Sequence, residues 1–172
     1  MREYFMCSER LGFARWQPED SDLATELWGE GAVTRYISAT GSFTPADIAA
    51  RLQTEVRNGQ DYGVQYWPLF ELEGGAFIGC CGLRPHQPEA GSFELGVHLK
   101  PACWGRGFAL EAAQTVVSYA FQALGIKEII AGHHPQNAAS GKLLGRLGFE
   151  QTGTAFYPPT GLMHVAYRCV KA

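Results

Sequence analysis

Alternating apolar and polar residues predict strands in the first part of the chain. The clearest segments are Tyr62–Glu71, Ala76–Leu83 and Ser92–Leu99, and turns rich in glycine or proline separate them. Leu11–Trp16 predicts one earlier strand. Consecutive strands with short connections pair antiparallel, so these segments predict an antiparallel meander. Pro68 lacks a backbone N–H, which predicts an edge position or a bulge in its strand.

Apolar residues three or four positions apart predict helices between these strands. Thr44–Asp47 has the sequence of a capping box with proline at the first helical position. We therefore expect a helix that begins there and ends at Asn58-Gly59. Ser21 predicts the N-cap of a shorter helix that extends through Trp28.

Helices and strands alternate in the last third of the chain. The expected elements are a long helix from Gly105-Arg106-Gly107 to Gly125, a strand over Glu128–Ala131, a helix from about Asn137 to Leu147, and two strands over Phe149–Tyr157 and Leu162–Val170. Antiparallel strands followed by this alternation predict an α+β fold, in which a mixed, mostly antiparallel sheet carries helices on both faces.

The composition indicates a globular protein without a disulfide framework. Hydrophobic residues make up 46% of the 172 residues and charged residues 18%, which predicts one domain over residues 1–172. The five cysteines are odd in number and include no CxxC pair, so we expect reduced thiols in a cytoplasmic protein. The first residues lack the apolar core of a signal peptide, and we expect no membrane partner.

The charge is unevenly distributed along the chain. The net charge of −3 argues against a nucleic-acid partner, which would require a basic face. Residues 1–89 hold 7 of the 14 basic and 13 of the 17 acidic side chains. This asymmetry arises by chance, or it reflects an anion bound by the C-terminal half and a cation approached by the N-terminal half.

The segment Phe93–Leu99 presents a carboxylate and an imidazole on one face. Strand alternation puts Glu94, Gly96 and His98 together, opposite the apolar positions. Gly96 would let a ligand approach the backbone, or would mark a bulge. The alternative is a strand whose polar face is solvated.

Two further segments have the character of ligand sites. The glycine turn Trp104–Ala109 opens a helix, where free amides and the helix dipole favour a pyrophosphate. Neither GxxxxGK[ST] nor GxGxxG is present, and a single GxG also occurs in ordinary turns. Asn137 and Ser140 share one helix face, and they either contact a ligand or cap their helix.

Taken in order, these segments resemble the GNAT acetyltransferase superfamily, and in particular the branch of ribosomal-protein N-terminal acetyltransferases (RimJ/RimL type) and their small-molecule relatives. The resemblance covers nearly the whole chain and is strongest from Phe77 to Phe149. The segments that carry it are Glu94-Leu95-Gly96-Val97, Trp104 to Ala112, Asn137-x-x-Ser140, and Leu143-Leu144-x-x-Leu147-Gly148-Phe149.

The resemblance implies a sheet of six or seven strands that splays at strand four, and acetyl-coenzyme A as co-substrate without a metal. The pantetheine arm would pair with backbone groups from Val97 through His98 to Leu99, and Asn137 would bond it. The amides of Trp104, Gly105, Arg106, Gly107, Phe108 and Ala109 would hold the pyrophosphate. One departure is Trp104, which stands where the family often has Gln or Arg.

The implied reaction is direct attack of a primary amine on the thioester. Glu94 is the first candidate for the general base, because it faces the expected site and its apolar sequence neighbours favour proton uptake. His98 is the second candidate and His133 the third. The Val97 N–H would stabilise the oxyanion, and Ser140 would protonate the departing thiolate.

Several alternatives stay open at this point. The chain could instead be a non-catalytic module that binds acetyl-coenzyme A. The acceptor is a protein N-terminus, a polyamine or aminoglycoside, or an amino-acid-like amine, and the family also allows a homodimer. Cys103 before a helix and the pair His133-His134 are weaker candidates for a nucleophile and a metal site. Four aromatic residues would wall an acceptor pocket or belong to the core: Trp16, Trp28, Tyr36 and Phe43.

Overall fold

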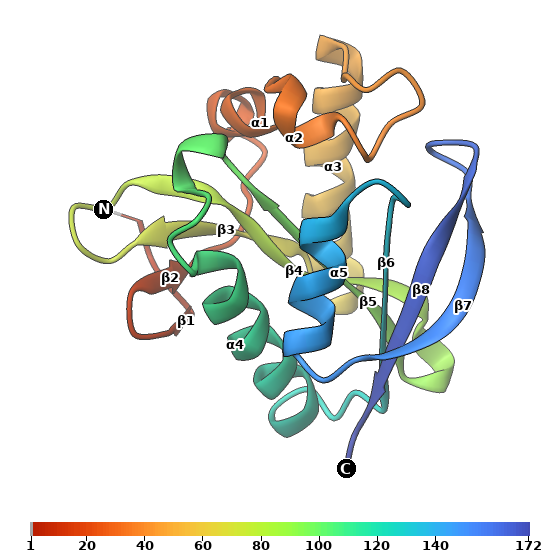
Figure 1. The fold of residues 1–172 in the computed structure, drawn as a ribbon. Helices are drawn as coiled ribbons and strands as arrows, with labels where there is room; N and C mark the ends of the chain where they lie inside the picture. Colours follow the sequence, from red (N-terminus) through yellow and green to blue (C-terminus); the bar gives the residue numbers. More distant parts are fainter. Residues whose placement is uncertain (1) are drawn as a thin grey trace.

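The computed structural model describes residues 2–172 and consists of one eight-stranded sheet with helices on both faces (Figure 1). The strand order is β1-β2-β3-β4-β5-β6-β8-β7. The strands are β1 (Met6–Cys7), β2 (Leu11–Phe13), β3 (Tyr66–Glu71), β4 (Phe77–Gln87), β5 (Ser92–Leu99), β6 (Glu128–His133), β7 (Glu150–Tyr157) and β8 (Leu162–Val170). The helices are α1 (Ser21–Trp28), α2 (Gly31–Thr34), α3 (Pro45–Tyr62), α4 (Phe108–Gln122) and α5 (Ala138–Arg146).

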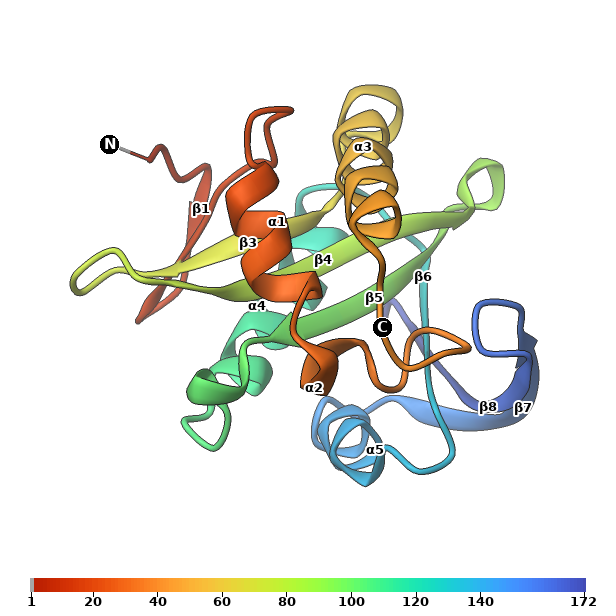
Figure 2. The ribbon, with the colours of Figure 1, turned by 90° about the horizontal axis from the view of Figure 1, so that it is seen from above.

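The apolar residues form two cores, one on each face of the sheet. On one face, α4 and α5 pack against the central strands around Leu95, Leu99 and Phe108. On the other face, α1 and α3 cover a second core that contains Trp28 and Tyr66. The view in Figure 2 shows these two helix layers on opposite sides of the strands. The predicted α+β fold and the helices on both faces are therefore confirmed.

The sheet differs from the expectation in strand number but not in the place of the splay. The extra strand is β1, whose two residues are too few to show an alternation that the sequence could reveal. All strand pairs are antiparallel except β5 and β6, which are parallel. These two strands pair only from Ser92 to Glu94 on β5, so the sheet divides there. β5 is the fourth of the strands predicted from the sequence, and the splay therefore lies where we expected it.

Several element boundaries also differ from the predicted ones: β2 ends at Phe13, β3 begins only at Tyr66, β4 continues to Gln87, β6 continues to His133 and α4 ends at Gln122. Helix α3 begins with the predicted capping box but continues past Gly59 to Tyr62, and Gly63 ends it at φ 72°. Gly59 is needed for packing, because a Cβ there would lie 2.7 Å from Nε2 of Gln65. The cap of α1 is Asp20 rather than Ser21. The predicted bulge at Pro68 is found one residue later, between Leu69 and Phe70 in the pairing of β3 with β4.

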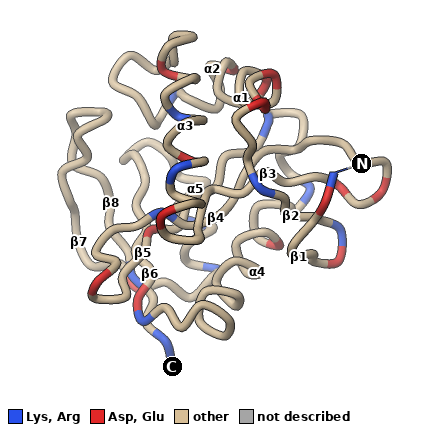
Figure 3. The backbone as a smooth tube through the Cα atoms, turned by 180° about the vertical axis from the view of Figure 1, so that it is seen from behind, with Lys and Arg blue, Asp and Glu red and all other residues tan. Residues whose placement is uncertain are grey.

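Ion pairs connect the two halves of the sequence in space. In Figure 3, acidic and basic positions lie close together over much of the backbone. Four ion pairs connect a residue of the first half with one of the second: Glu26–Lys100, Glu71–Arg106, Arg84–Glu94 and Arg10–Glu111. None of the helices within residues 2–172 has the length and apolarity required to cross a membrane.

Candidate active site

The division of the sheet exposes one edge of β5 beyond Glu94. The Lys100 N–H donates to the Ile78 carbonyl of β4 at 3.0 Å, and Gly79 lies opposite Leu99. Because peptide groups alternate in direction along a strand, the N–H and C=O of Val97 and Leu99 point away from β4. They therefore face the gap between β5 and β6, where the sequence expectation placed the pantetheine arm.

The glycine turn before α4 lies next to this gap. Gly105 and Gly107 have φ of 73° and 79°, values that favour glycine, and Gly107 is the N-cap of α4. The first amides of a helix have no carbonyl partner within the helix, and residues 104–107 are exposed. The indole N–H of Trp104 donates to the Leu99 carbonyl at 2.9 Å, so this side chain connects the turn to β5. The arrangement can receive an anion at the end of the gap.

Asn137 and Ser140 are brought together at the start of α5. The Asn137 side chain accepts a hydrogen bond from the Ser140 N–H at 3.3 Å, so Asn137 is the N-cap of α5. The capping alternative is thus correct for the Asn137 carbonyl oxygen. No hydrogen bond joins the Asn137 side-chain NH2 group to the Ser140 hydroxyl. Both side chains are half-buried.

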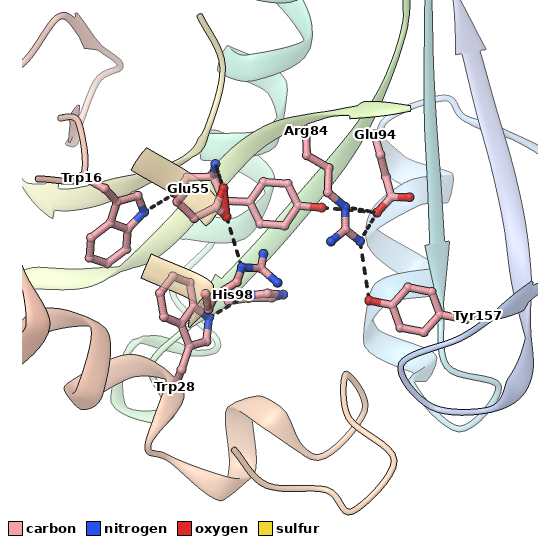
Figure 4. Close-up of polar contacts among 9 residues, drawn as sticks. Trp16, Trp28, Glu55, Arg84, Glu94, His98 and Tyr157 are labelled. Atoms are coloured by element: carbon pink, nitrogen blue, oxygen red, sulfur yellow. Dashed lines mark hydrogen bonds and ion pairs between the residues drawn. The ribbon is translucent and has the colours of Figure 1, made fainter. Parts of the chain in front are cut away.

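Glu94 lies in a polar cluster on the sheet face opposite α4 (Figure 4). Its Oε1 accepts from Arg84 Nε at 2.9 Å, from Arg84 Nη2, and from the Tyr66 hydroxyl at 3.3 Å. Arg84 Nη2 also donates to the Tyr157 hydroxyl at 3.5 Å. The apolar surroundings that we expected for Glu94 are therefore replaced by a guanidinium and a phenol, because side chains from β3 and β4 converge on it.

Tyr66 is the central residue of this cluster. Its ring lies over Gly96, where an added Cβ would be 2.2 Å from the ring, so the space above Gly96 holds Tyr66. Burial raises the pKa of Tyr66 well above its usual value, which keeps the phenol protonated as a donor to Glu94. Glu55 accepts from the Tyr66 backbone N–H at 3.1 Å and pairs with Arg51 at 3.1 Å.

His98 has the character of a hydrogen-bond donor. The Trp28 indole N–H donates to His98 Nδ1 at 3.1 Å, which leaves the ring proton of the neutral imidazole on Nε2. Burial, followed by the charges of Arg51 and Arg84, holds the pKa of His98 well below its usual value. The lone pair that a base requires is thus already engaged. Figure 4 shows the contact with Trp28.

The third candidate base, His133, lies on the other face of the sheet. It follows Ile129 and Ala131 in the alternation of β6, and both belong to the core under α4. Its Nδ1–H donates to the His134 carbonyl at 2.7 Å, and a Cβ at Gly141 of α5 would lie 3.2 Å from its Nε2. His133 and Glu94 are therefore separated by the sheet.

A series of aromatic rings in contact continues from the Glu94 cluster toward α2. Tyr157 packs on His164 with 4.4 Å between ring centroids, His164 on His134 with 5.5 Å, and His134 on Tyr36 with 4.9 Å. Of these four residues, only Tyr36 is among the aromatic residues that the sequence indicated as walls of an acceptor pocket. The other three come from β6–α5, β7 and β8, and no local motif indicates that they meet.

The remaining residues that the sequence indicated as candidates lie in the core or at its margin. Trp16 and Trp28 are buried in the core, and Phe43 packs at its margin. Cys103 is buried, and its burial raises the pKa of the thiol, which disfavours a nucleophilic thiolate. Residues 2–172 contain no group of three or more His, Cys, Asp or Glu side chains suited to a metal ion.

Comparison with known proteins agrees with this geometry. The family model for the acetyltransferase (GNAT) domain matches residues 10–150. The chain is 32% identical over 147 residues to the uncharacterized N-acetyltransferase p20 of Bacillus licheniformis, covering 85% of this chain and 82% of the relative. It is 33% identical over 93 residues to the [ribosomal protein uS5]-alanine N-acetyltransferase of Escherichia coli, covering 52% and 47% of the two chains.

A solved structure supports the same assignment at the level of the fold. RimL, a ribosomal alpha-N-protein acetyltransferase in complex with coenzyme A, superimposes with a TM-score of 0.81 at 14% identity, covering 98% of each chain. The family uses acetyl-coenzyme A as donor. The divided sheet, the glycine turn and these matches together show that the chain belongs to the GNAT acetyltransferase family and is an acyl-CoA-dependent acetyltransferase.

Proposed function

We propose that the protein transfers an acetyl group from acetyl-coenzyme A to a primary amine, either a protein N-terminus or a small-molecule amine. The observation that carries this proposal is the gap between β5 and β6, which ends at the glycine turn of α4. An extended arm fits along an open strand edge, and an anionic group fits at a helix N-terminus. Acetyl-coenzyme A combines both features in one molecule.

In this proposal the donor is held largely by the backbone. Val97 and Leu99 offer peptide groups to the pantetheine arm, and the amides of residues 104–109 receive the pyrophosphate. The Leu99 carbonyl already accepts from Trp104, so the Leu99 N–H is the group left for the arm. The amide of Asn137 would bind the arm from the opposite side, since α5 follows β6.

The same geometry supports roles for the reacting groups. Glu94 is the base that takes the proton from the acceptor ammonium, directly or through a water molecule. His98 is better suited to donate a hydrogen bond, because its Nδ1 is engaged by Trp28. The Val97 N–H faces the gap and is the proposed oxyanion donor, and the Ser140 hydroxyl is the proposed proton donor to the thiolate. The amine forms its bond to the acetyl carbon while the C–S bond breaks.

The first experiment is a thermal-shift titration with acetyl-coenzyme A, in which ATP and NAD serve as controls. A ligand at 100 times its dissociation constant stabilises the fold by about 2.7 kcal/mol, which is a shift of several degrees. We expect a shift with acetyl-coenzyme A that neither control reproduces. Absence of a shift in folded, ligand-free protein would exclude the proposed donor site.

A second experiment separates an enzyme from a binding module. Release of free thiol from acetyl-coenzyme A is followed with a panel of peptides with free N-termini, polyamines, aminoglycosides and amino acids. An enzyme releases thiol in proportion to one class of acceptor. Binding of acetyl-coenzyme A without acceptor-dependent thiol release across the panel would favour the non-catalytic module.

A further inference from the structure

The turn between β1 and β2 contacts the glycine turn of α4, although the two are about a hundred residues apart in the sequence. The Ser8 hydroxyl and the Arg10 backbone N–H both donate to Glu111 Oε1 at 2.7 Å. Arg10 Nε donates to Glu111 Oε2, also at 2.7 Å. Glu111 lies in the first turn of α4, and in Figure 1 the β1–β2 turn lies beside the start of this helix.

Arg10 also holds one peptide group of the glycine turn. Its Nη1 donates to the Arg106 carbonyl at 2.9 Å. The N–H of Gly107 belongs to the same trans peptide, so it points in the direction opposite to that carbonyl. Gly107 on one side gives this peptide freedom to rotate. The bond from Arg10 fixes it with the Gly107 N–H directed away from Arg10.

The second effect of Arg10 is electrostatic. Burial raises the pKa of Glu111, but hydrogen bonds from Ser8 and Arg10 outweigh this and hold it below its usual value, so Glu111 is an anion. An uncompensated anion in the first turn of α4 would repel a pyrophosphate at the same helix end. Arg10 supplies the compensating charge, and its guanidinium lies over the Phe108 ring at 4.4 Å.

We propose that Arg10 is a positioning residue of the donor site, which orients the Gly107 N–H toward the pyrophosphate and neutralises Glu111. The N-terminal β1–β2 turn is then part of the acetyl-coenzyme A site. This inference rests on the proposed function, because it assumes that the glycine turn binds the donor. It concerns the affinity for the donor and not the chemical step.

The test is a calorimetric titration of coenzyme A into wild-type protein and variants at low and high salt. Arg10→Gln removes the charge and the bond to the Arg106 carbonyl, and we expect about tenfold weaker binding. Arg10→Lys keeps the charge, but its single ammonium group cannot reach both Glu111 Oε2 and the Arg106 carbonyl oxygen. We therefore expect an intermediate loss of affinity for coenzyme A. Arg2→Gln is the matched control, because it also breaks an N-terminal ion pair, with Asp20.

A double variant tests the electrostatic effect separately. Glu111→Gln in the Arg10→Gln background removes the uncompensated anion, so part of the lost affinity returns, and the difference between the two variants shrinks at high salt. Thermal midpoints without coenzyme A report on the fold. A merely structural Arg10 would lower the midpoint and leave the affinity of the folded fraction unchanged.

The outcomes separate this inference from the proposed function. If wild-type protein does not bind coenzyme A, the proposed donor site is wrong. If the wild type binds and Arg10→Gln binds equally well, or weakens no more than Arg2→Gln, Arg10 has no positioning role. If Glu111→Gln restores none of the affinity lost in Arg10→Gln, the neutralising role is wrong.

Discussion

Gly96 is the position where one added methyl group tests the geometry of the Glu94 cluster. In Gly96→Ala the new Cβ would lie 2.2 Å from two atoms of the Tyr66 ring and 2.5 Å from its hydroxyl. Carbon atoms in ordinary contact are about 3.5–4.0 Å apart, so the ring must move by more than an ångström. Tyr66 is only 2% exposed, and its backbone N–H is held by Glu55, so little space is available for that movement.

The expected cost follows from this overlap. Overpacking a buried site destabilises a protein by about 1–3 kcal/mol, whereas Gly→Ala in an unstrained backbone stabilises it by up to about 1 kcal/mol through the unfolded chain. The overlap dominates, so we expect a net loss of about 1–2 kcal/mol and a midpoint lower by several degrees. The displaced phenol also loses its hydrogen bond to Glu94, so kcat should fall.

Denaturant unfolding and steady-state kinetics measure these two effects. Gly145→Ala is the matched control, because Gly145 lies within α5 and its added Cβ would meet nothing within 4 Å. We expect this variant to be as stable as the wild type or up to about 1 kcal/mol more stable. Equal stability of Gly96→Ala and Gly145→Ala, with unchanged kcat, would refute the placement of Tyr66 over Gly96.

Three further predictions concern the base, the imidazole and the glycine turn. Glu94→Gln should lower kcat about 100-fold with little change in the affinity for acetyl-coenzyme A; full activity across pH would exclude Glu94 as base. Because the folded pKa of His98 is depressed, it contributes stability above about pH 6.5 that is lost as pH falls toward its folded pKa. Urea titrations at several pH values should therefore show a smaller acid-induced loss in His98→Gln than in the wild type. Trp104→Phe keeps the ring but removes the donor to Leu99, so KM for acetyl-coenzyme A should rise several-fold at constant kcat; an unchanged KM would make that contact irrelevant.

Features that depend on neighbouring residues could be predicted from the sequence. The alternation over Phe93–Leu99 assigns each side chain to the correct face, and Thr44–Asp47 forms the predicted capping box. Both depend on contacts within a few residues, where spacing alone determines geometry. The two-residue strand β1 and the continuation of α3 past Gly59 depend on tertiary packing, which spacing does not encode.

The surroundings of Glu94 could not be predicted because they depend on register across three strands. Tyr66 pairs with Gly82, and Gly82 pairs with Gly96, so a shift of one residue in either ladder would move Tyr66 away from Glu94. The apolar sequence neighbours of Glu94 point to the opposite face and therefore say nothing about its surroundings. Only the fold brings Arg84 to Glu94 and Tyr157 to Arg84.

The glycine turn could be predicted from the sequence and the surroundings of Glu94 could not. The physical reason is the way in which the two substrates would be bound. In the proposed donor site the anion would be received by backbone amides of one contiguous turn, and the glycines that this turn requires appear as a motif in the sequence. The face around Glu94, which we propose for the acceptor, is built from side chains of β3, β4, β5, β7 and the segment before α5, which no motif connects. Arg10 lies between these cases, because it acts on a contiguous motif from about a hundred residues away. Variants of Arg10 therefore test whether the donor affinity of a site that was predicted from the glycine turn alone also depends on a residue distant in the sequence.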